Sequence, residues 1–411
     1  MATQPCVLRG GRVLRTGATR PERLDMVIGP DGRIATVTPR APTLPEAQDI
    51  NLAGRLITPG LVDAHQHLDK SRTRSEVPNP AGTLGGAIAA FRAYAEHRMA
   101  HAEIIARAER TLEACLARGT VVIRSHANVD PVLRTRSVEA LIDLRERWQH
   151  RMRLQVVAML SGTAARNLAA ARAWMQAALA AGADGVGGTP ALAEDPLAFL
   201  DLLFEVAEHA GRWLDVHLDE HLDAGRHHFE LIIERTRVLG FQGRVVASHC
   251  SALSALPLSE AQRIIAGLAD AGVGVITLPA ANLFLQGRDA SQLPPRGLTR
   301  VRELLAAGVP VACASDNIQD PFVPTGSGDM LEMARWTVLA GQLGGEALAH
   351  AYAMATTIPA QLLGLGEAYG LHEGARADLM ITPAEDAEDL VASGPLDRAV
   401  FVGGQLVAGR V

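Results

Sequence analysis

Two histidines, His65 and His67, are the residues whose type and spacing first suggest chemistry in this sequence. They close the apolar segment 61–64, which follows the turn-forming pair Pro59-Gly60. Side chains two positions apart on a β-strand share a face, so both imidazoles would point the same way. Neutral imidazole is a common ligand of zinc and iron, and the pair could therefore be half of a metal site. The pair alone is equally compatible with two histidines on a polar strand face that bind no metal.

Further polar residues close other apolar segments of the chain. They are His126 in VVIRSHAN, His217 in LDVHLDE, His249 in VVASHC and Asp316 in VACASDN. An isolated polar group at the buried end of a strand would be costly. Because such endings recur along one chain, chance is a poor explanation for them, and we expect these side chains to meet at one face of a sheet.

The elements that must position these residues alternate between short apolar strands and amphipathic helices. We expect strands at 60–67, 120–126, 154–160, 185–188, 213–217, 244–249, 273–278 and 309–315. We expect helices at 102–117, 137–148, 166–180, 196–208, 228–239, 259–271 and 299–307. Eight strands alternating with helices predict an α/β fold, a (β/α)8 TIM barrel, with its chemistry at the carboxyl ends of the strands. An open doubly wound sheet is the alternative, although no GxGxxG follows the first strand.

Both ends of the chain have the pattern of short strands between turns. Candidate strands lie at 6–14, 24–28 and 33–37, and again within 370–381 and 397–407. Neither end alone has enough strands to close a core. We therefore expect residues 1–58 and 370–411 to form one small β-sandwich domain together, and residues 59–369 to form the barrel.

The composition narrows the classes of partner. The chain has 411 residues, of which 48% are hydrophobic and 20% charged, as in ordinary globular proteins. A net charge of -6 gives no basic footprint for nucleic acid. Four scattered cysteines without a CxxC pair fit a reduced, cytoplasmic protein. We find no signal peptide and no apolar run of membrane-spanning length, so no membrane partner is expected. Lys70 is the only lysine.

An ordered set of motifs gives the chain a resemblance to a known superfamily. The motifs are PGLVDAHQHLDK (59–70), AGTL (81–84), IRSHANVD (123–130), DVHLDE (215–220), VVASHC (245–250), NLFLQGR (282–288), RGLTRVRELLAAG (296–308) and SDNIQDPF (315–322). In this order they resemble the amidohydrolase superfamily, and within it the cytosine deaminase branch. HxH after a strand is weak evidence alone, but HxH, HxDE, a histidine after strand six and an aspartate after strand eight together are specific.

The resemblance implies one metal ion held by four side chains, and two further groups that act beside it. The implied ligands are His65, His67, His217 and Asp316, with Glu220 as the proton shuttle and His249 beside the reacting water. Three imidazoles and one carboxylate leave a coordination position for water, whose pKa a divalent metal lowers towards neutrality. Zinc and iron both suit this ligand set.

A binuclear site is disfavoured by the fourth strand. Such a site would need a bridging carboxylated lysine or a carboxylate at the end of that strand, which reads ADGVGGTP (183–190). Its only acidic residue, Asp184, lies at the start of the strand, and Lys70 follows a different strand. We therefore expect a single metal.

The residues expected to contact substrate depart from the cytosine deaminase pattern. That branch has a glutamine after strand three, where this chain has Ser161, and serine cannot reproduce the paired donor and acceptor of an amide. Asn317 and Phe322 stand where that branch has an aspartate and a tryptophan. Leu84 and Asn282, from two of the matching motifs, complete the candidate substrate-binding set. An asparagine after the strand-eight aspartate resembles the N-isopropylammelide amidohydrolase relatives.

These features predict an enzyme, a cytosine deaminase-like aminohydrolase that releases ammonia from a small amino-substituted heterocycle such as a pyrimidine or triazine. We expect metal-bound hydroxide to attack the amidine-like carbon while Glu220 moves protons, with His249 and Asp316 as further catalytic groups. The alternatives are release of an alkylamine from a triazine, and opening of a cyclic amide. A catalytically inactive scaffold is a third possibility, but such a chain would usually have lost ligands. We also expect a homo-oligomer, as is common in the family.

Overall fold

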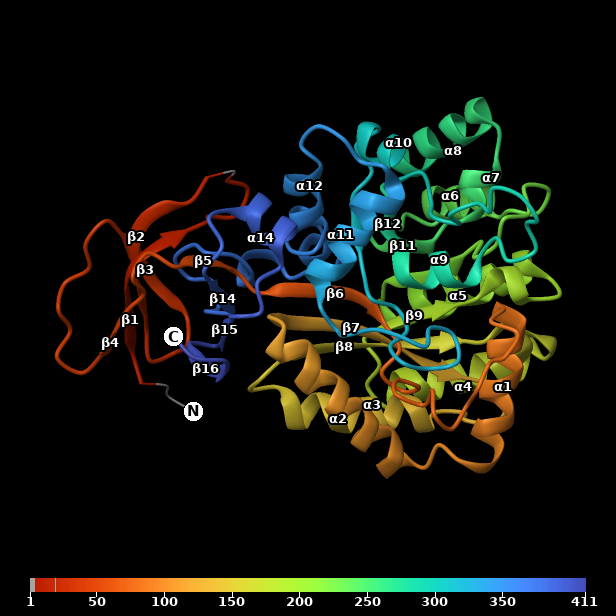
Figure 1. The fold of residues 1–411 in the computed structure, drawn as a ribbon. Helices are drawn as coiled ribbons and strands as arrows, with labels where there is room; N and C mark the ends of the chain where they lie inside the picture. The colour runs from red at the N-terminus through yellow and green to blue at the C-terminus, as the bar shows by residue number, and fades with distance from the viewer. Residues whose placement is uncertain (1–3, 19) are drawn as a thin grey trace.

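The computed structural model describes residues 4–18 and 20–411. A parallel eight-stranded sheet in the order β13-β12-β11-β10-β9-β8-β7-β6 forms its centre. The strands are β6 (Leu61–Gln66), β7 (Thr120–Val129), β8 (Arg153–Leu160), β9 (Gly185–Gly188), β10 (Leu214–Leu218), β11 (Val245–His249), β12 (Gly274–Thr277) and β13 (Val311–Cys313). A parallel bridge between Gln66 and Asp316 brings the last strand back to the first. The barrel prediction is confirmed (Figure 1).

Helices cover the outside of the barrel. They are α1 (Leu84–His97), α2 (His101–Ala117), α3 (Arg136–Trp148), α4 (Leu168–Ala180), α5 (Pro196–Ala210), α6 (Phe229–Val238), α7 (Ala252–Ala255), α8 (Leu258–Asp270), α9 (Pro279–Leu285), α10 (Val301–Ala306), α11 (Met330–Gly341), α12 (Ala347–Met354) and α13 (Thr357–Leu362). In α8 the buried residues are Ala261, Ile264, Ile265 and Leu268, a spacing that puts one apolar stripe against the sheet. Seven of these helices match the ranges predicted from the sequence within a few residues, whereas α1, α7, α9 and α11–α13 were not predicted.

The two chain ends build a second sheet together. Its strands are β1 (Cys6–Val13), β2 (Glu22–Ile28), β3 (Ile34–Thr38), β4 (Gln48–Asn51), β5 (Leu56–Pro59), β14 (Leu379–Thr382), β15 (Ala399–Val402) and β16 (Gln405–Ala408), with the helix α14 (Ala387–Ser393) between β14 and β15. β14 pairs with β5 and so joins the two ends of the chain. The sheet has its own apolar cluster, which includes Met26, Ile57 and Phe401. This confirms a small β unit made from both termini, and its exact domain boundaries stay a prediction.

A buried ion pair connects this second sheet to the barrel. Arg398, directly before β15, has a completely buried side chain, and two of its nitrogens donate to the Asp329 carboxylate at 2.9 Å each. Asp329 is also the residue that caps α11, where its side chain accepts the backbone N–H of Leu331. The pair therefore fixes a barrel helix and a terminal strand at the same point.

Replacing this arginine is expected to destabilise the fold strongly. In Arg398→Ala the Asp329 carboxylate stays buried without its partner, which should lower the free energy of unfolding by about 3–5 kcal/mol. Urea unfolding followed by circular dichroism measures the change. The control is Arg166→Ala, because Arg166 pairs with Glu194 while both side chains are about three-quarters exposed, and its loss should change stability by less than about 0.5 kcal/mol. Equal effects of the two variants would contradict the structural role of Arg398.

Two further observations concern the chain as a whole. Over the described part of the chain, no helix combines the length and the apolar character needed to cross a membrane. All four cysteines are buried and free, as their scattered positions in the sequence predicted.

Candidate active site

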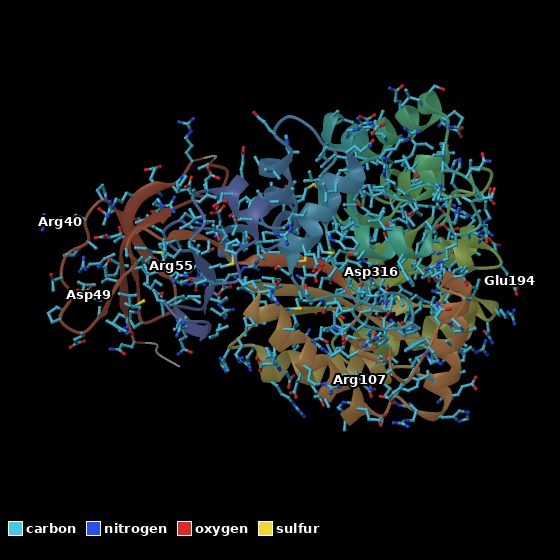
Figure 2. All side chains as sticks on the ribbon, in the orientation of Figure 1. Arg40, Asp49, Arg55, Arg107, Glu194 and Asp316 are labelled. Carbon is cyan, nitrogen blue, oxygen red and sulfur yellow. The ribbon has the colours of Figure 1, made fainter. Side chains whose placement is uncertain are left out.

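Four side chains from three strand ends converge at the carboxyl face of the barrel. His65 and His67 come from the end of β6, His217 from β10, and Asp316 from the segment that follows β13. Nε2 of His67 lies 3.1 Å from Nε2 of His217 and 3.2 Å from Oδ1 of Asp316. Nε2 of His65 lies 3.5 Å from the same carboxylate oxygen. All four residues are buried, and Figure 2 labels Asp316 within the barrel part of the molecule.

The chemistry and spacing of this cluster fit a metal ion. Ligands about 2.0–2.1 Å from a tetrahedral metal lie about 3.3 Å from one another, close to the separations above. Nε2 of His65 and Oδ1 of Asp316 are buried and have no hydrogen-bond partner among the described residues, which would be costly unless they bind something. Ligand atoms of His65, His217, His249 and Asp316 also lie within 4.8 Å of one another. His249 is therefore a fifth group at the cluster.

The protonation states expected from burial also suit metal ligation. Burial, followed by the positive charge of Lys70, lowers the pKa of His67 to about 3. Burial and the neighbouring histidines hold the pKa of His217 well below its ordinary value. Burial alone would raise the pKa of Asp316, but the adjacent imidazoles of His65 and His67 hold it well below its usual value. His67 and His217 are thus neutral and the Asp316 carboxylate is ionised, which are the forms that bind metal.

A chain of buried polar groups behind His65 fixes the orientation of its ring. Nδ1 of His65 lies 3.0 Å from the hydroxyl of Ser248, and that hydroxyl donates to Asp215 at 3.1 Å. Arg124 donates to the other oxygen of Asp215 at 2.9 Å. Such partners leave Nε2 of His65 directed at the cluster, as second partners of metal-binding histidines commonly do. These hydrogen bonds were not predicted, although Asp215 and Ser248 belong to the motifs DVHLDE and VVASHC.

The only lysine of the sequence supports His67 in the same way. Nζ of Lys70 lies 3.0 Å from Nδ1 of His67, 3.0 Å from Oδ1 of Asp69 and 2.9 Å from Oδ1 of Asn128. Oδ2 of Asp69 accepts the backbone N–H of Asn128 in turn. From the sequence, Lys70 was expected to order the loop after the first barrel strand and not to bridge two metals; in the structure it lies behind His67.

His126 lies underneath the cluster rather than on the cavity. Its ring packs against that of His65, with centroids 4.1 Å apart, and its Nε2 is 3.5 Å from Oδ1 of Asp215. His65, His126 and Asp215 also form a group of ligand-type atoms close enough to hold an ion. Because Asp215 is already paired with the Arg124 cation, this second position is electrostatically less suited to a metal.

Glu220 and His249 face the cluster from two neighbouring strands. Glu220 follows β10, and its Oε1 lies 3.7 Å from Nδ1 of His249 at the end of β11. Burial, reinforced by the Asp316 carboxylate, raises the pKa of Glu220 well above its ordinary value, so that the carboxyl group can carry a proton. Burial lowers the pKa of His249 to about 3, and its Nε2 lies 3.9 Å from Oδ2 of Asp316.

Several turns at this face have a backbone that non-glycine residues rarely adopt. Positive φ angles occur at Asp219 (50°), His249 (67°), Cys250 (51°) and Asp316 (59°). Such angles are uncommon outside glycine and gather at functional sites, where the surrounding structure enforces them. Nδ1 of His228 lies 2.6 Å from Oδ1 of Asp219, a contact that holds the turn carrying Glu220.

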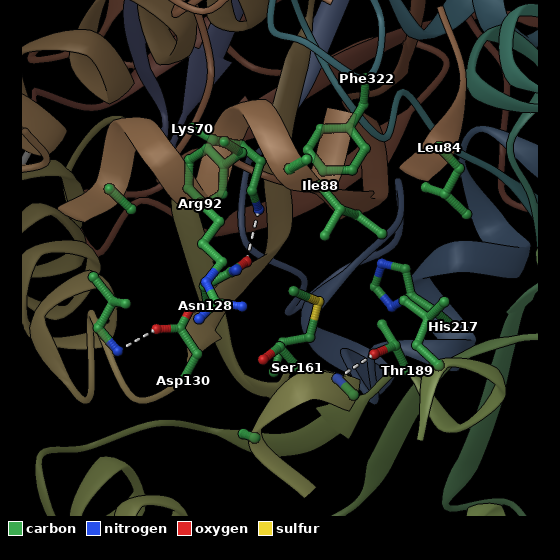
Figure 3. Close-up of a pocket in the computed structure, with 18 of the residues that line it drawn as sticks. Lys70, Leu84, Ile88, Arg92, Asn128, Asp130, Ser161, Thr189, His217 and Phe322 are labelled. Atoms are coloured by element: carbon green, nitrogen blue, oxygen red, sulfur yellow. Dashed lines mark hydrogen bonds between the residues drawn. The ribbon is translucent and has the colours of Figure 1, made fainter. Parts of the chain in front are cut away.

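A cavity of about 680 Å³ opens over the cluster. His67, His217, Glu220, His249 and Asp316 are part of its lining. Helix α1 contributes Leu84, Ile88, Phe91 and Arg92 to the lining, which also includes Met159, Ser161, Thr189 and Leu192. Figure 3 shows Leu84, Ile88 and Phe322 on one side and Ser161 with Thr189 on the other. Helix α1 was not predicted from the sequence, and neither were its lining residues except Leu84.

The residues predicted to contact substrate have different positions. Ser161, Asn317, Phe322 and Leu84 line the cavity. Asn282 is not part of the lining, and its Nδ2 lies 3.1 Å from Nδ1 of His249, where it is buried. Asn282 is therefore placed to orient His249, which makes it a partner of a cavity residue and not a contact of the cavity itself.

Comparisons with known proteins extend over nearly the whole chain. Residues 48–184 and 135–408 match the sequence profile of the amidohydrolase family. A pterin deaminase from Rhizobium rhizogenes (strain K84) is 31% identical over 386 residues, 94% of this chain and 88% of that protein. An N-isopropylammelide isopropyl amidohydrolase from Pseudomonas sp. (strain ADP) is 30% identical over 341 residues, 81% of each.

Two solved structures of deaminase and aminohydrolase enzymes are also similar to this chain over nearly its whole length. The 5-methylcytosine deaminase from Klebsiella pneumoniae, liganded with 5-fluorocytosine, superposes with a TM-score of 0.89 at 29% identity, covering 98% of each chain. The N-isopropylammelide isopropylaminohydrolase from Burkholderia multivorans superposes with a TM-score of 0.85 at 32% identity, covering 99% of each chain.

Proposed function

The chain belongs to the amidohydrolase family, and from that premise we propose that it removes ammonia hydrolytically from an amino-substituted nitrogen heterocycle. It is an enzyme that acts on C–N bonds, as its relatives are. The observation that carries the proposal is the meeting of His65, His67, His217 and Asp316 beside Glu220 at the floor of one cavity. His126 and Asn282 stand outside the proposed substrate contacts.

We propose that His65, His67, His217 and Asp316 hold one divalent metal, zinc or iron. When bound, such a metal supplies Lewis-acid activation of water and of the attacked carbon. The protein residues supply the proton transfers. Glu220, carrying a proton, donates it to the ring nitrogen beside the carbon that water attacks. Asp316 accepts the proton that the attacking water loses. Glu220, now a carboxylate, takes the remaining hydroxyl proton of the adduct and transfers it to the departing amino group, and the proton on Asp316 returns to Glu220 at the end of the cycle. The C–N bond breaks, and ammonia and a lactam result.

His249 has a positioning and stabilising part in this scheme. Asn282 contacts Nδ1 of His249 and so directs the opposite nitrogen, Nε2, towards Asp316 and the space above it. A donor in that place stabilises the oxyanion that forms when water adds to the ring carbon. Apolar side chains of α1 and Phe322 line the cavity beside these groups.

The size of the cavity bears on the substrate. A volume of about 680 Å³ is in the range that holds a drug-sized ligand and exceeds the need of a single six-membered ring. This favours a bicyclic amino heterocycle, or a monocyclic one with a substituent. The second candidate function is release of an alkylamine from a triazine, which Asn317 and the apolar wall of α1 also support.

We expect ammonia release from at least one member of a panel of amino-substituted pyrimidines, triazines, purines and pterins. The metal-loaded enzyme is assayed for ammonia, and mass spectrometry of the same mixtures identifies the organic product. A bicyclic member should be turned over faster than its single-ring counterpart, because the larger ring system occupies more of the cavity and contacts more of its apolar lining. Metal-depleted enzyme is the control. An alkylamine product would favour the second candidate, and a ring-opened product without ammonia would contradict both.

The proposal also includes the cellular compartment and the partners of the enzyme. Four buried, free cysteines support a reducing compartment, the cytoplasm. The proposed partners are a small heterocyclic substrate and further copies of the chain, without nucleic acid or membrane.

A further inference from the structure

The side-chain amide of Asn317 has a fixed orientation. Its Nδ2 lies 2.7 Å from Oδ2 of Asp320. A carboxylate can only accept a hydrogen bond, so the nitrogen of the amide must face Asp320 and the oxygen must face away. Asn317 lines the cavity, and its oxygen has no hydrogen-bond partner among the residues that the structure describes. The amide therefore offers the cavity an acceptor.

Asp320 is itself held in place. Its other oxygen, Oδ1, accepts the backbone N–H groups of Phe322 at 2.9 Å and Val323 at 3.1 Å. Its own backbone N–H donates to the carbonyl of Val323 at 3.0 Å. Asp320 is buried, with an exposed fraction of 1%. Because the carboxylate is anchored through Oδ1, Oδ2 stays directed at Asn317, and a reversal of the amide would bring two acceptors together.

We propose that Asp320 is a positioning residue that makes Asn317 a hydrogen-bond acceptor, and that the enzyme thereby selects heterocycles that present a ring N–H at this wall of the cavity. The inference rests on the proposed function and names a property of the substrate class. A heterocycle with a methyl group or a bare lone pair at that position leaves the amide oxygen of Asn317 buried and unpaired. Sites that form a hydrogen bond with their ligand discriminate strongly against ligands that lack the donor.

The protonation of Asp320 sets the conditions of a test. Burial raises the pKa of Asp320 to about 7, although the bond from Asn317 and the backbone N–H of Val323 act against this rise. The Lys70 ammonium also lowers the pKa. Measurements at pH 8.5 therefore keep the carboxylate form, in which the described orientation of Asn317 applies.

The test compares Asp320→Asn with the unaltered enzyme. In this variant the side-chain oxygen of residue 320 can still accept the two backbone N–H groups, which leaves its NH2 group facing Asn317. The amide of Asn317 should then turn and present its own nitrogen to the cavity. The probes are uracil and lumazine, the lactams formed by deamination of cytosine and pterin, together with their N-methyl derivatives, titrated calorimetrically into metal-loaded protein.

The expected result is a loss of affinity that depends on the ring N–H. Asp320→Asn should weaken binding of the parent lactam by about 10- to 100-fold and change binding of the derivative methylated at the recognised nitrogen by less than about threefold. The double variant Asn317→Asp/Asp320→Asn should restore the preference, because the NH2 group of residue 320 then donates to a carboxylate whose second oxygen faces the cavity. Equal losses for all probes, or no rescue, would overturn the proposal.

A second readout is independent of any ligand. The side-chain amide of Asn317, labelled with nitrogen-15 and identified by its absence in Asn317→Asp, should show slow proton exchange in the unaltered protein and fast exchange in Asp320→Asn. Unchanged exchange would overturn the fixed orientation. If no probe binds although exchange behaves as expected, the orientation stands and the selection is refuted. Bound probes without ammonia release from any substrate would instead refute the proposed function.

Discussion

Glu220→Gln is expected to lower turnover by about 10²- to 10⁴-fold while the fold and the bound metal are retained. Glutamine has nearly the same shape as glutamic acid, but it cannot exchange a proton with the ring nitrogen or the leaving amine. The high pKa of Glu220, caused by burial and by Asp316, is the property that the substitution removes. Steady-state kinetics of ammonia release, with the metal content measured by atomic emission, tests this expectation.

The matched control for that variant is Glu113→Gln. Glu113 lies on α2 and pairs with Arg151, and about half of its side chain is exposed. The same chemical change there should leave turnover within about twofold, since surface substitutions away from a site have small effects. Full activity of Glu220→Gln would refute its role as proton shuttle. A loss of metal in that variant would show instead that Glu220 is a ligand.

His217→Asn is expected to abolish metal binding at micromolar metal concentration, and turnover with it. Removing one of four ligands leaves the three others converging on an incomplete site. His217 contacts His67 directly, so the loss is at the centre of the cluster. The measurement is the number of metal ions per chain after dialysis against metal-free buffer, with near-ultraviolet circular dichroism to show that the barrel is intact.

His126→Asn is the comparison that separates the two groups of possible ligands. Both histidines are buried, and their ring centroids are 4.9 Å apart, so the two substitutions disturb the same part of the core. The proposed site contains His217 but not His126, and His126→Asn should therefore retain about one metal per chain. If His126→Asn lost the metal and His217→Asn kept it, the ion would belong to the group around Asp215.

Sequence patterns predicted the regularly alternating strands and helices of the barrel. The eight barrel strands are short apolar segments, and β9 was predicted with its observed bounds, 185–188. His65, His67, His217, His249 and Asp316 could be found because each closes such a segment, and the topology of a barrel brings all strand ends to one face. In contrast, the sequence places Leu84–His97 after a long irregular loop, and the weak apolar periodicity of LGGAIAAFRAYAEH did not identify α1.

Contacts between distant residues could not be predicted from local patterns. Lys70 and Asn128 are 58 positions apart, and Ser248 and His65 are 183 positions apart. Lys70 meets Asn128 because β6 pairs with β7. His65 meets Ser248 because the sheet closes into a barrel, in which β11 lies across from β6. The sequence gives the residue types at these places but not the hydrogen bonds, which depend on the three-dimensional closure of the barrel. The orientation of the Asn317 amide could not be predicted from the sequence either, because it depends on how the Asp320 carboxylate is anchored.

The single lysine of this chain has a practical consequence. Lys70 is 2% exposed and its amino group is surrounded by His67, Asp69 and Asn128. Amine-directed reagents, such as activated esters, therefore find no accessible lysine side chain in the folded protein. If the intact protein is treated with such a reagent and then digested, an acylated Lys70 peptide identifies molecules in which the barrel had opened.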